Sequence, residues 1–311
     1  MRGESLLACA LVVVVGATGC GSGETGPRSL VEVERMAFVP AGSARLPFEF
    51  GTGAEYGCAQ DLLVDRFEVA REDWAHWFGA PPQPDGLSTG LAYSSGGREA
   101  WPAYANFHQA SEFATLRRMR LPTAREWLWI AAGPRALEYP WGVLPQASVS
   151  NTLELDLRRP VAVGTFEQGR SPNGCYDLAG NVAEWVVLDG LPVGQASAAL
   201  VDVDTAVMGG SFLSKLRPQF GREPGATGQR IAGEVLSPGT RGVELGLRCV
   251  VEAQGFLIES APQWREVSGA RERLRRLGRR WGAAAIPLLE KIVDGSDPRD
   301  PLNWLLEGAR G

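Results

Sequence analysis

The chain has 311 residues, enough for one large domain or two ordinary ones. Its 44% hydrophobic and 22% charged residues are typical of a globular protein and exclude a largely disordered one. The formal charge of −5 argues against a nucleic-acid partner, and the only two histidines, His76 and His108, argue against a His-rich iron or zinc centre.

The first twenty residues have the pattern of a targeting segment. Arg2 is followed by an apolar run over 6–15 that is too short to span a bilayer, and small residues then precede Cys20. This resembles a bacterial lipobox, so we expect a signal peptide over 1–20, lipidation of Cys20 and a flexible tether over 21–30. The protein would then be exported and anchored to the cell envelope, in the periplasm or at the outer membrane. The alternative is an ordinary secretory signal with a chance cysteine.

Short strands and helices are predicted for the next hundred residues. Apolar residues predict strands over 31–39 and 62–69, and apolar stripes predict helices over 72–78 and 106–118. Thr123 and Glu126 have the spacing of a capping box and predict the start of another helix.

Fewer periodic segments follow. Strands are predicted over 160–166, 208–212 and 245–251. Seven of the ten tryptophans lie between residues 74 and 185, and we expect them mainly in the core.

The most informative stretch is 170–185, which reads R-S-P-N-G-C-Y-D-L-A-G-N-V-A-E-W. Asp177, Gly180, Asn181 and Glu184 fall within eight residues on a glycine-rich backbone. Carboxylates and carbonyls crowded into an irregular segment suit a hard cation such as calcium. The alternative is that the two carboxylates only accept hydrogen bonds from nearby backbone.

Five sequence words occur in a characteristic order. They are R-L-P-T-A-R-E-W at 120–127, Y-P-W-G at 139–142, G-N-V-A-E-W at 180–185, M-G-G-S-F at 208–212 and G-L-R-C-V at 246–250. Their order resembles the formylglycine-generating enzyme (sulfatase-modifying factor) family. The resemblance implies an α+β, C-type-lectin-like fold with little regular secondary structure, here over residues 31–252.

The resemblance also implies which residues would carry chemistry. Enzymes of this family oxidise a substrate cysteine to formylglycine with a copper ion held by two cysteines, and Ser214 and Gln219 stand at those two positions here. Neutral oxygens are poor ligands for Cu(I), so we expect no copper and no copper chemistry. A non-catalytic binding or scaffolding role is the first hypothesis. A diverged enzyme that uses Ser214, Gln219 and Arg222 is the alternative.

For the metal site, the resemblance implies a structural calcium. Its ligands would be the carboxylates of Asp177 and Glu184 with the backbone carbonyls of Gly180 and Val182.

Three cysteines remain in the expected mature chain: Cys58, Cys175 and Cys249. An exported protein meets an oxidising compartment, so one disulfide is expected. The resemblance would pair Cys249 with a cysteine at the position that Ala114 occupies. Cys249 is therefore expected to pair with Cys58 or with Cys175.

The last segment, 253–311, is predicted to be an arginine-rich helical extension. Seven arginines lie within 264–281 beside leucines and a tryptophan at helical spacing, and Asp300-Pro301 predicts a last short helix. The favoured interpretation is a helix packed on the domain by its apolar stripe. The alternative is a basic amphipathic helix that binds an anionic membrane or an acidic partner and carries the function. Partners expected overall are an unknown envelope protein or ligand and, through the N-terminal lipid, a membrane.

Overall fold

The structure is a computed structural model that describes residues 28–311 except 48–53, 80–97, 195–202, 223–228 and 296. The predicted signal peptide, Cys20 and nearly all of the tether lie outside these residues. Within the described part, none of the helices combines the length and apolar character that a membrane crossing needs.

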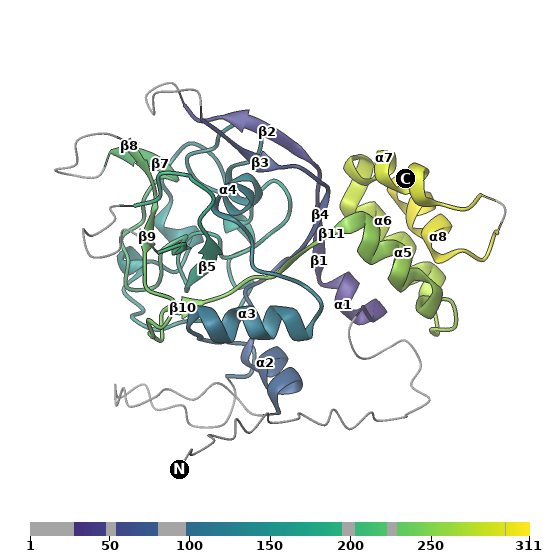
Figure 1. The fold of residues 1–311 in the computed structure, drawn as a ribbon, viewed down its shortest axis with the longest axis horizontal. Helices are drawn as coiled ribbons and strands as arrows, with labels where there is room; N and C mark the ends of the chain where they lie inside the picture. The colour runs from purple at the N-terminus through teal and green to yellow at the C-terminus, as the bar shows by residue number, and fades with distance from the viewer. Residues whose placement is uncertain (1–27, 48–53, 80–97, 195–202, 223–228, 296) are drawn as a thin grey trace, which may run out of the picture.

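The described chain mixes short helices with short strands (Figure 1). The helices are α1 (Leu30–Glu34), α2 (Arg71–Phe78), α3 (Phe107–Leu116), α4 (Ala124–Ala132), α5 (Ala253–Trp264), α6 (Ala270–Trp281), α7 (Ile286–Ile292) and α8 (Pro301–Ala309). The strands are β1 (Met36–Val39), β2 (Gly42–Arg45), β3 (Glu55–Cys58), β4 (Leu62–Asp65), β5 (Ala183–Val187), β6 (Thr205–Met208), β7 (Phe220–Arg222), β8 (Gln229–Ile231), β9 (Gly233–Val235), β10 (Leu245–Gly246) and β11 (Val250–Glu252). The predicted α+β class is confirmed.

Two small sheets organise these elements. The first has the order β1-β4-β11 and is antiparallel, with Phe38 opposite Leu63 and Val250 opposite Val64. The second has the order β10-β5-β6-β9, and only its β10–β5 pair is parallel. Two hairpins, β2–β3 and β7–β8, complete the strands. Long irregular segments connect these elements, as the sequence predicted.

Capping chemistry explains where the predicted helices begin. The Asn106 side chain accepts from the Gln109 amide, and the Thr123 hydroxyl accepts from the Glu126 amide, so both form capping boxes. Asp300 caps α8 in front of Pro301. The helices predicted over 72–78 and 106–118 are confirmed as α2 and α3.

Every predicted strand differs from the structure to some extent. The strand predicted over 62–69 is shorter, as β4, and that over 245–251 is divided into β10 and β11, which belong to different sheets. Residues 30–34 form α1, because the Ser29 hydroxyl accepts from the Glu32 amide and starts a helix before β1. Residues 160–166 form no strand, since the Val161 amide donates to the side chain of Asn181. β6 ends at Met208, and Gly209 and Gly210 turn the chain with φ of 86° and 68°.

The C-terminal helices share a core with the domain. Helices α5 to α8 lie beside the β1-β4-β11 sheet (Figure 1). One hydrophobic cluster contains Phe38 and Trp185 of the domain together with Trp281 and Leu305 of the extension. The rings of Phe38 and Trp281 are 5.8 Å apart, and the Trp281 indole donates to the Met36 carbonyl. The extension is therefore an added layer on the sheet.

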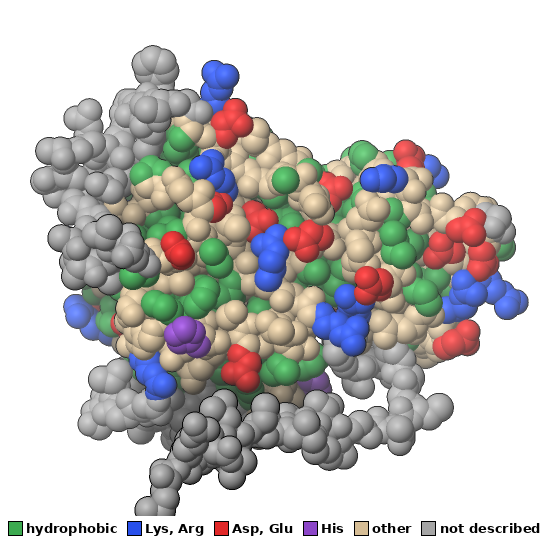
Figure 2. All heavy atoms as spheres, in the orientation of Figure 1, with side chains coloured by type: hydrophobic (Ala, Val, Ile, Leu, Met, Phe, Trp, Pro, Cys, Tyr) green, Lys and Arg blue, Asp and Glu red, His purple; other side chains and the backbone are tan. Residues whose placement is uncertain are grey.

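Arginines of α6 form ion pairs with acidic residues of neighbouring helices. Arg273 pairs with Glu34 of α1 at 2.6 Å, and Arg275 pairs with Glu307 of α8 at 2.5 Å. Figure 2 shows acidic and basic side chains interspersed over the visible face of these helices. This arrangement supports the packed-helix interpretation over a uniformly basic membrane-binding face.

Candidate functional site

The segment that the sequence singled out is organised by a buried arginine. The Arg248 guanidinium donates to the carboxylate of Glu184 at 2.6 Å and 3.0 Å. It also donates to the carbonyls of Tyr176 at 2.6 Å and Asp65 at 2.7 Å. The Trp127 indole donates to the second Glu184 oxygen at 2.7 Å. Burial opposes charge on Arg248, but the Glu184 carboxylate outweighs it, and the net effect is a raised Arg248 pKa.

A second acidic residue, Glu68, fixes the turn from the other side. Its two carboxylate oxygens accept from the Val182 amide at 2.9 Å and from the Asn181 side chain at 2.5 Å. Burial, together with the charges of Asp177 and Glu184, raises the pKa of Glu68 well above its ordinary value. Glu68 was not predicted because it lies 113 residues before Asn181; the only signal was its place in the strand predicted over 62–69.

These contacts do not fit the predicted calcium shell. Glu184 is committed to Arg248, whose positive charge would repel a divalent cation at the same carboxylate. Asp177 accepts from the Gly164 amide at 2.6 Å, and burial raises the pKa of Asp177 to about 6. Among the described residues, no three His, Cys, Asp or Glu side chains are grouped to hold a metal.

The predicted disulfide is absent from the described residues. Cys58, Cys175 and Cys249 are all buried free thiols. Cys249 belongs to the hydrophobic cluster on one face of the β1-β4-β11 sheet, whereas Cys58 and Cys175 belong to the cluster on the other face. The sheet therefore separates Cys249 from both expected partners. Burial raises the pKa of Cys58 to about 12 and that of Cys175 to about 11.

The two positions of the missing copper cysteines line one cavity. Ser214 and Gln219 both border a cavity of about 640 Å³, which we call the Ser214 cavity. It lies where the loop after β6 passes the second sheet, and Thr152, Glu234 and Glu244 also line it. Arg222, the third residue of the enzyme alternative, lies in β7, and its side chain is outside the described part of the structure.

Two residues that line this cavity each carry a buried polar atom without a hydrogen-bond partner among the described residues. The atoms are Gln219 Oε1 and Thr152 Oγ1, on residues that are 3% and 2% exposed. The Gln219 backbone is fixed, because its amide donates to the Glu138 carbonyl and its carbonyl accepts from Ala232. A buried acceptor without a donor costs about 1–3 kcal/mol, so a ligand that brought a donor to either atom would recover part of that cost.

Ser214 itself has no activating base. Its hydroxyl accepts from the Ser211 amide at 3.1 Å within a local turn. Neither His76 nor His108 is among the described residues that line the cavity. A nucleophilic serine needs an adjacent base, so this arrangement does not provide an activated nucleophile.

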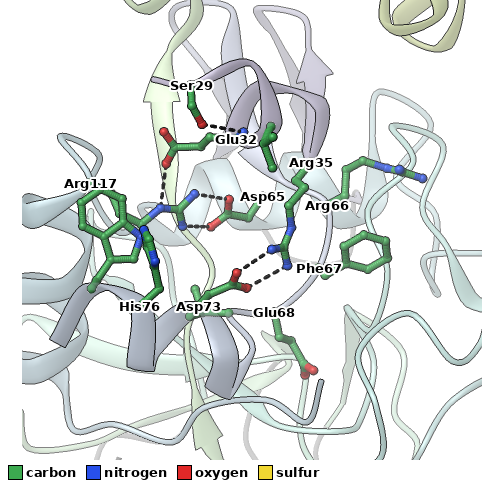
Figure 3. Close-up of a pocket in the computed structure, with 13 residues that line it drawn as sticks. Ser29, Glu32, Arg35, Asp65, Arg66, Phe67, Glu68, Asp73, His76 and Arg117 are labelled. Carbon is green, nitrogen blue, oxygen red and sulfur yellow. Dashed lines mark hydrogen bonds and ion pairs between the residues drawn. The ribbon is translucent and has the colours of Figure 1, made fainter. Parts of the chain in front are cut away.

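A smaller cavity of about 220 Å³ lies between α1, α2 and α3 (Figure 3). Arg117 makes two hydrogen bonds to Asp65, at 2.7 Å and 2.8 Å, and a third to Glu32 at 2.9 Å. Arg35 faces Asp73 in a second pair, while Glu68 points away toward the turn that it holds (Figure 3). Because these charged groups pair with one another, they hold the surrounding elements together, and this cavity is a weaker candidate for ligand binding.

A profile of one known protein family matches most of this chain. The profile described as "Sulfatase-modifying factor enzyme 1-like domain" matches residues 22–253. A hercynine oxygenase of Mycolicibacterium thermoresistibile is 36% identical over 87 residues, 26% of this chain and 19% of that protein. The mouse "Inactive C-alpha-formylglycine-generating enzyme 2" is 27% identical over 48% of this chain and 53% of its own length. The formylglycine-generating enzyme of Mycobacterium tuberculosis is 27% identical over 59% of this chain and 69% of its own length.

Among solved structures, the Treponema denticola variable protein 1 has a TM-score of 0.49. It is 18% identical in sequence and covers 70% of this chain and 94% of its own. The matched region of the hercynine oxygenase is about a fifth of that enzyme.

Proposed function

The chain belongs to the sulfatase-modifying factor enzyme 1-like domain family, and from this premise we propose that it is a binding or scaffolding protein without copper chemistry. Its ligand or partner segment would occupy the Ser214 cavity. The observation that carries the proposal is that Ser214 and Gln219, which stand where the resemblance places the two sulfur ligands, line one cavity of about 640 Å³. Such a replacement removes the affinity for Cu(I), and the cavity offers space for a bound chain.

The nearest possible replacement thiols do not restore the copper site. The three described cysteines are buried, and none of them lines the Ser214 cavity. Two thiolates at one open position are what Cu(I) binding needs, and burial keeps these thiols protonated.

The chemistry of the cavity favours a peptide segment as its occupant. Gln219 Oε1 needs an N–H or O–H donor, which the backbone amides of an extended peptide supply. Leu213 and Leu216 add apolar surface, while Lys215 and Glu234 add both charges at the same cavity. This mixture suits a partner protein better than a lipid tail or a single ion.

A diverged enzyme is the second candidate, because a concave polar cavity is also what a substrate needs. Against it stand the locally bonded Ser214 hydroxyl and the lack of a histidine among the described lining residues. Iron chemistry of the kind that uses several histidines lacks its ligands for the same reason, since the whole chain has two.

We also propose an envelope location, with Cys20 lipidated and left as the new N-terminus when the residues before it are removed. Metabolic labelling with a fatty-acid probe tests this directly. The full chain should be labelled and should sediment with membranes, and the Cys20→Ala variant should lose the label. Labelling that persists in the variant would contradict the assignment.

Copper binding tests the loss of catalysis. The full chain is titrated with Cu(I) against a competing chelator and then incubated with a cysteine-containing sulfatase peptide under oxygen. We expect neither stoichiometric Cu(I) binding nor conversion of the peptide cysteine to an aldehyde. Binding of one Cu(I) together with turnover would refute the proposal.

Site-specific photo-crosslinking tests the binding role. A photoreactive amino acid replaces Leu213, which is 48% exposed at the cavity, or Leu144, which is 67% exposed elsewhere. In envelope extracts we expect a defined adduct only from position 213. The adduct should weaken about tenfold when Gln219→Met removes the buried amide. Equal adducts from both positions would argue against a ligand in this cavity.

A further inference from the structure

A groove at the seam between the domain and the C-terminal extension gathers positive charge. Four arginines line a hollow of about 550 Å³: Arg66, Arg135, Arg170 and Arg280. We call it the arginine groove. None of the described residues that line it is acidic. Such a concentration of guanidinium groups without lining carboxylates differs from the smaller cavity of Figure 3, where Arg117 and Arg35 pair with acidic residues that line the same cavity.

Arg66 is held in place by groups that leave its charge uncompensated. Its Nε donates to the Gly174 carbonyl, and its guanidinium lies over the rings of Phe67 at 5.2 Å and Tyr176 at 5.4 Å. Stacking on aromatic faces orients a guanidinium and leaves its other N–H groups available for an anion.

Arg280 lies on α6 and is also held by backbone carbonyls. It donates to the backbone carbonyls of Glu34 and Met36. Burial and then the charge of Arg66 lower the pKa of Arg280 to about 10, against the opposing effects of Glu34 and Tyr176. The two guanidinium groups therefore repel each other across the groove, and an anion between them would relieve that repulsion.

The remaining two arginines stand at the mouth of the groove. Arg170 pairs with Glu167 at 3.1 Å, but the two side chains are 54% and 65% exposed, so the pair is weak. Arg135 is exposed and forms no ion pair with a described residue. Trp141 and Trp281 add ring surface to the walls.

From this arrangement we propose that the arginine groove binds a phosphate group, either as a free phosphate compound or as the headgroup of an anionic lipid. Guanidinium groups match phosphate oxygens with paired hydrogen bonds, and several of them converge here. Arg280 and Trp281 come from the segment beyond residues 22–253 that the family profile matches. The groove therefore gives the C-terminal extension a binding role that the domain alone lacks.

Two arms of one experiment separate the sources of the phosphate. Calorimetry of the full chain with inorganic phosphate, against chloride at equal ionic strength, measures binding of the free anion. Sedimentation with phosphatidylglycerol vesicles, against phosphatidylcholine vesicles, measures the headgroup, because any lipid anchor contributes equally to both. Saturable binding in either arm is the expected result.

The variants decide whether the groove is responsible. Arg135→Gln/Arg170→Gln changes two exposed side chains, so folding should be unaffected, and binding should weaken at least about tenfold. The charge-matched control Arg276→Gln/Arg299→Gln removes two exposed arginines outside the groove and should leave binding within about twofold. Arg280→Gln, checked for an unchanged unfolding midpoint, should weaken binding like the first variant. No binding in both arms, or equal losses in test and control, would overturn the proposal.

Discussion

Arg248 and Glu184 form an ion pair inside the core, with 2.6 Å between Nη2 and Oε1 and at most 1% of either side chain exposed. The pair joins the word G-L-R-C-V to the word G-N-V-A-E-W, which lie 64 residues apart in sequence. The same guanidinium also holds two backbone carbonyls of the surrounding loops. Arg248 thus occupies the role of a structural cation in a region with little regular backbone.

Replacement of Glu184 by glutamine should destabilise the fold strongly. The variant Glu184→Gln keeps the shape of the side chain but leaves Arg248 charged and unpaired in the core. Breaking a buried pair in this way costs about 3–5 kcal/mol in the free energy of unfolding. Urea denaturation followed by tryptophan fluorescence measures the change.

An exposed ion pair supplies the control for this variant. Arg158 and Asp156 are 2.7 Å apart with side chains that are 66% and 72% exposed. Arg158→Gln should therefore change the free energy of unfolding by less than about 1 kcal/mol. If Glu184→Gln were as mild as this control, the Arg248–Glu184 pair would not be an organising contact of the turn.

Calcium should leave the stability of the protein unchanged. A ligand that binds only the folded state stabilises it by about 2.7 kcal/mol at a hundred times its dissociation constant. Because Glu184 is taken up by Arg248, we expect no shift of the unfolding midpoint on adding millimolar calcium or a chelator. Magnesium at the same ionic strength is the control. A calcium-specific rise of several degrees would restore the calcium assignment.

Asp177 should make the protein less stable as the pH rises from about 4 to about 6. Burial raises the pKa of the folded Asp177 carboxyl to about 6, above its ordinary value of 3.8. The folded state therefore binds the proton more tightly, and its stabilising effect, about 3 kcal/mol, is present below pH 4 and lost through pH 6. Glu68, whose pKa is also raised, should add to this loss.

The variant Asp177→Asn tests this pH dependence. Asparagine keeps a carbonyl oxygen for the Gly164 amide and tolerates the local φ of 59°. Its stability should fall less between pH 4 and pH 6 than that of the unchanged protein, and above pH 7 it should be the more stable of the two. An unchanged pH profile, measured by thermal unfolding, would show that Asp177 is not a buried titrating group.

Local chemistry made much of the fold predictable. Capping residues such as Thr123 and Asp300 act within three positions of their partners, so the sequence marks their helices directly. The helical character of the extension follows from local signals of the same kind, whereas the fold class was implied by the resemblance of the five sequence words to a known family. The strand expected over 160–166 failed because its backbone is held by the distant side chain of Asn181, which no local pattern reveals.

The candidate site was predictable only in part, for the same reason. Ser214 and Gln219 were recognised from the word M-G-G-S-F, and the structure brings both to one cavity. Glu68 and Arg248 act across 64 or more residues, so their contacts with the turn could not be inferred from spacing. The arginine groove combines three arginines of the domain with Arg280 of the arginine-rich extension, and no local pattern shows that these residues meet.

Close packing of α6 against α8 should make Gly278 intolerant of any side chain. A Cβ atom at Gly278 would lie 2.1 Å from the Leu305 carbonyl, so Gly278→Ala must push the two helices apart. We expect a loss of about 1–3 kcal/mol in the free energy of unfolding, measured by urea denaturation.

Gly255→Ala is the matched control, because Gly255 lies on α5 with nothing within 4 Å of the new atom. That substitution should be neutral or stabilising by up to about 1 kcal/mol, since alanine favours a helix. Equal effects of the two substitutions would mean that α8 does not dock closely on α6, and the shared core of domain and extension would then need revision.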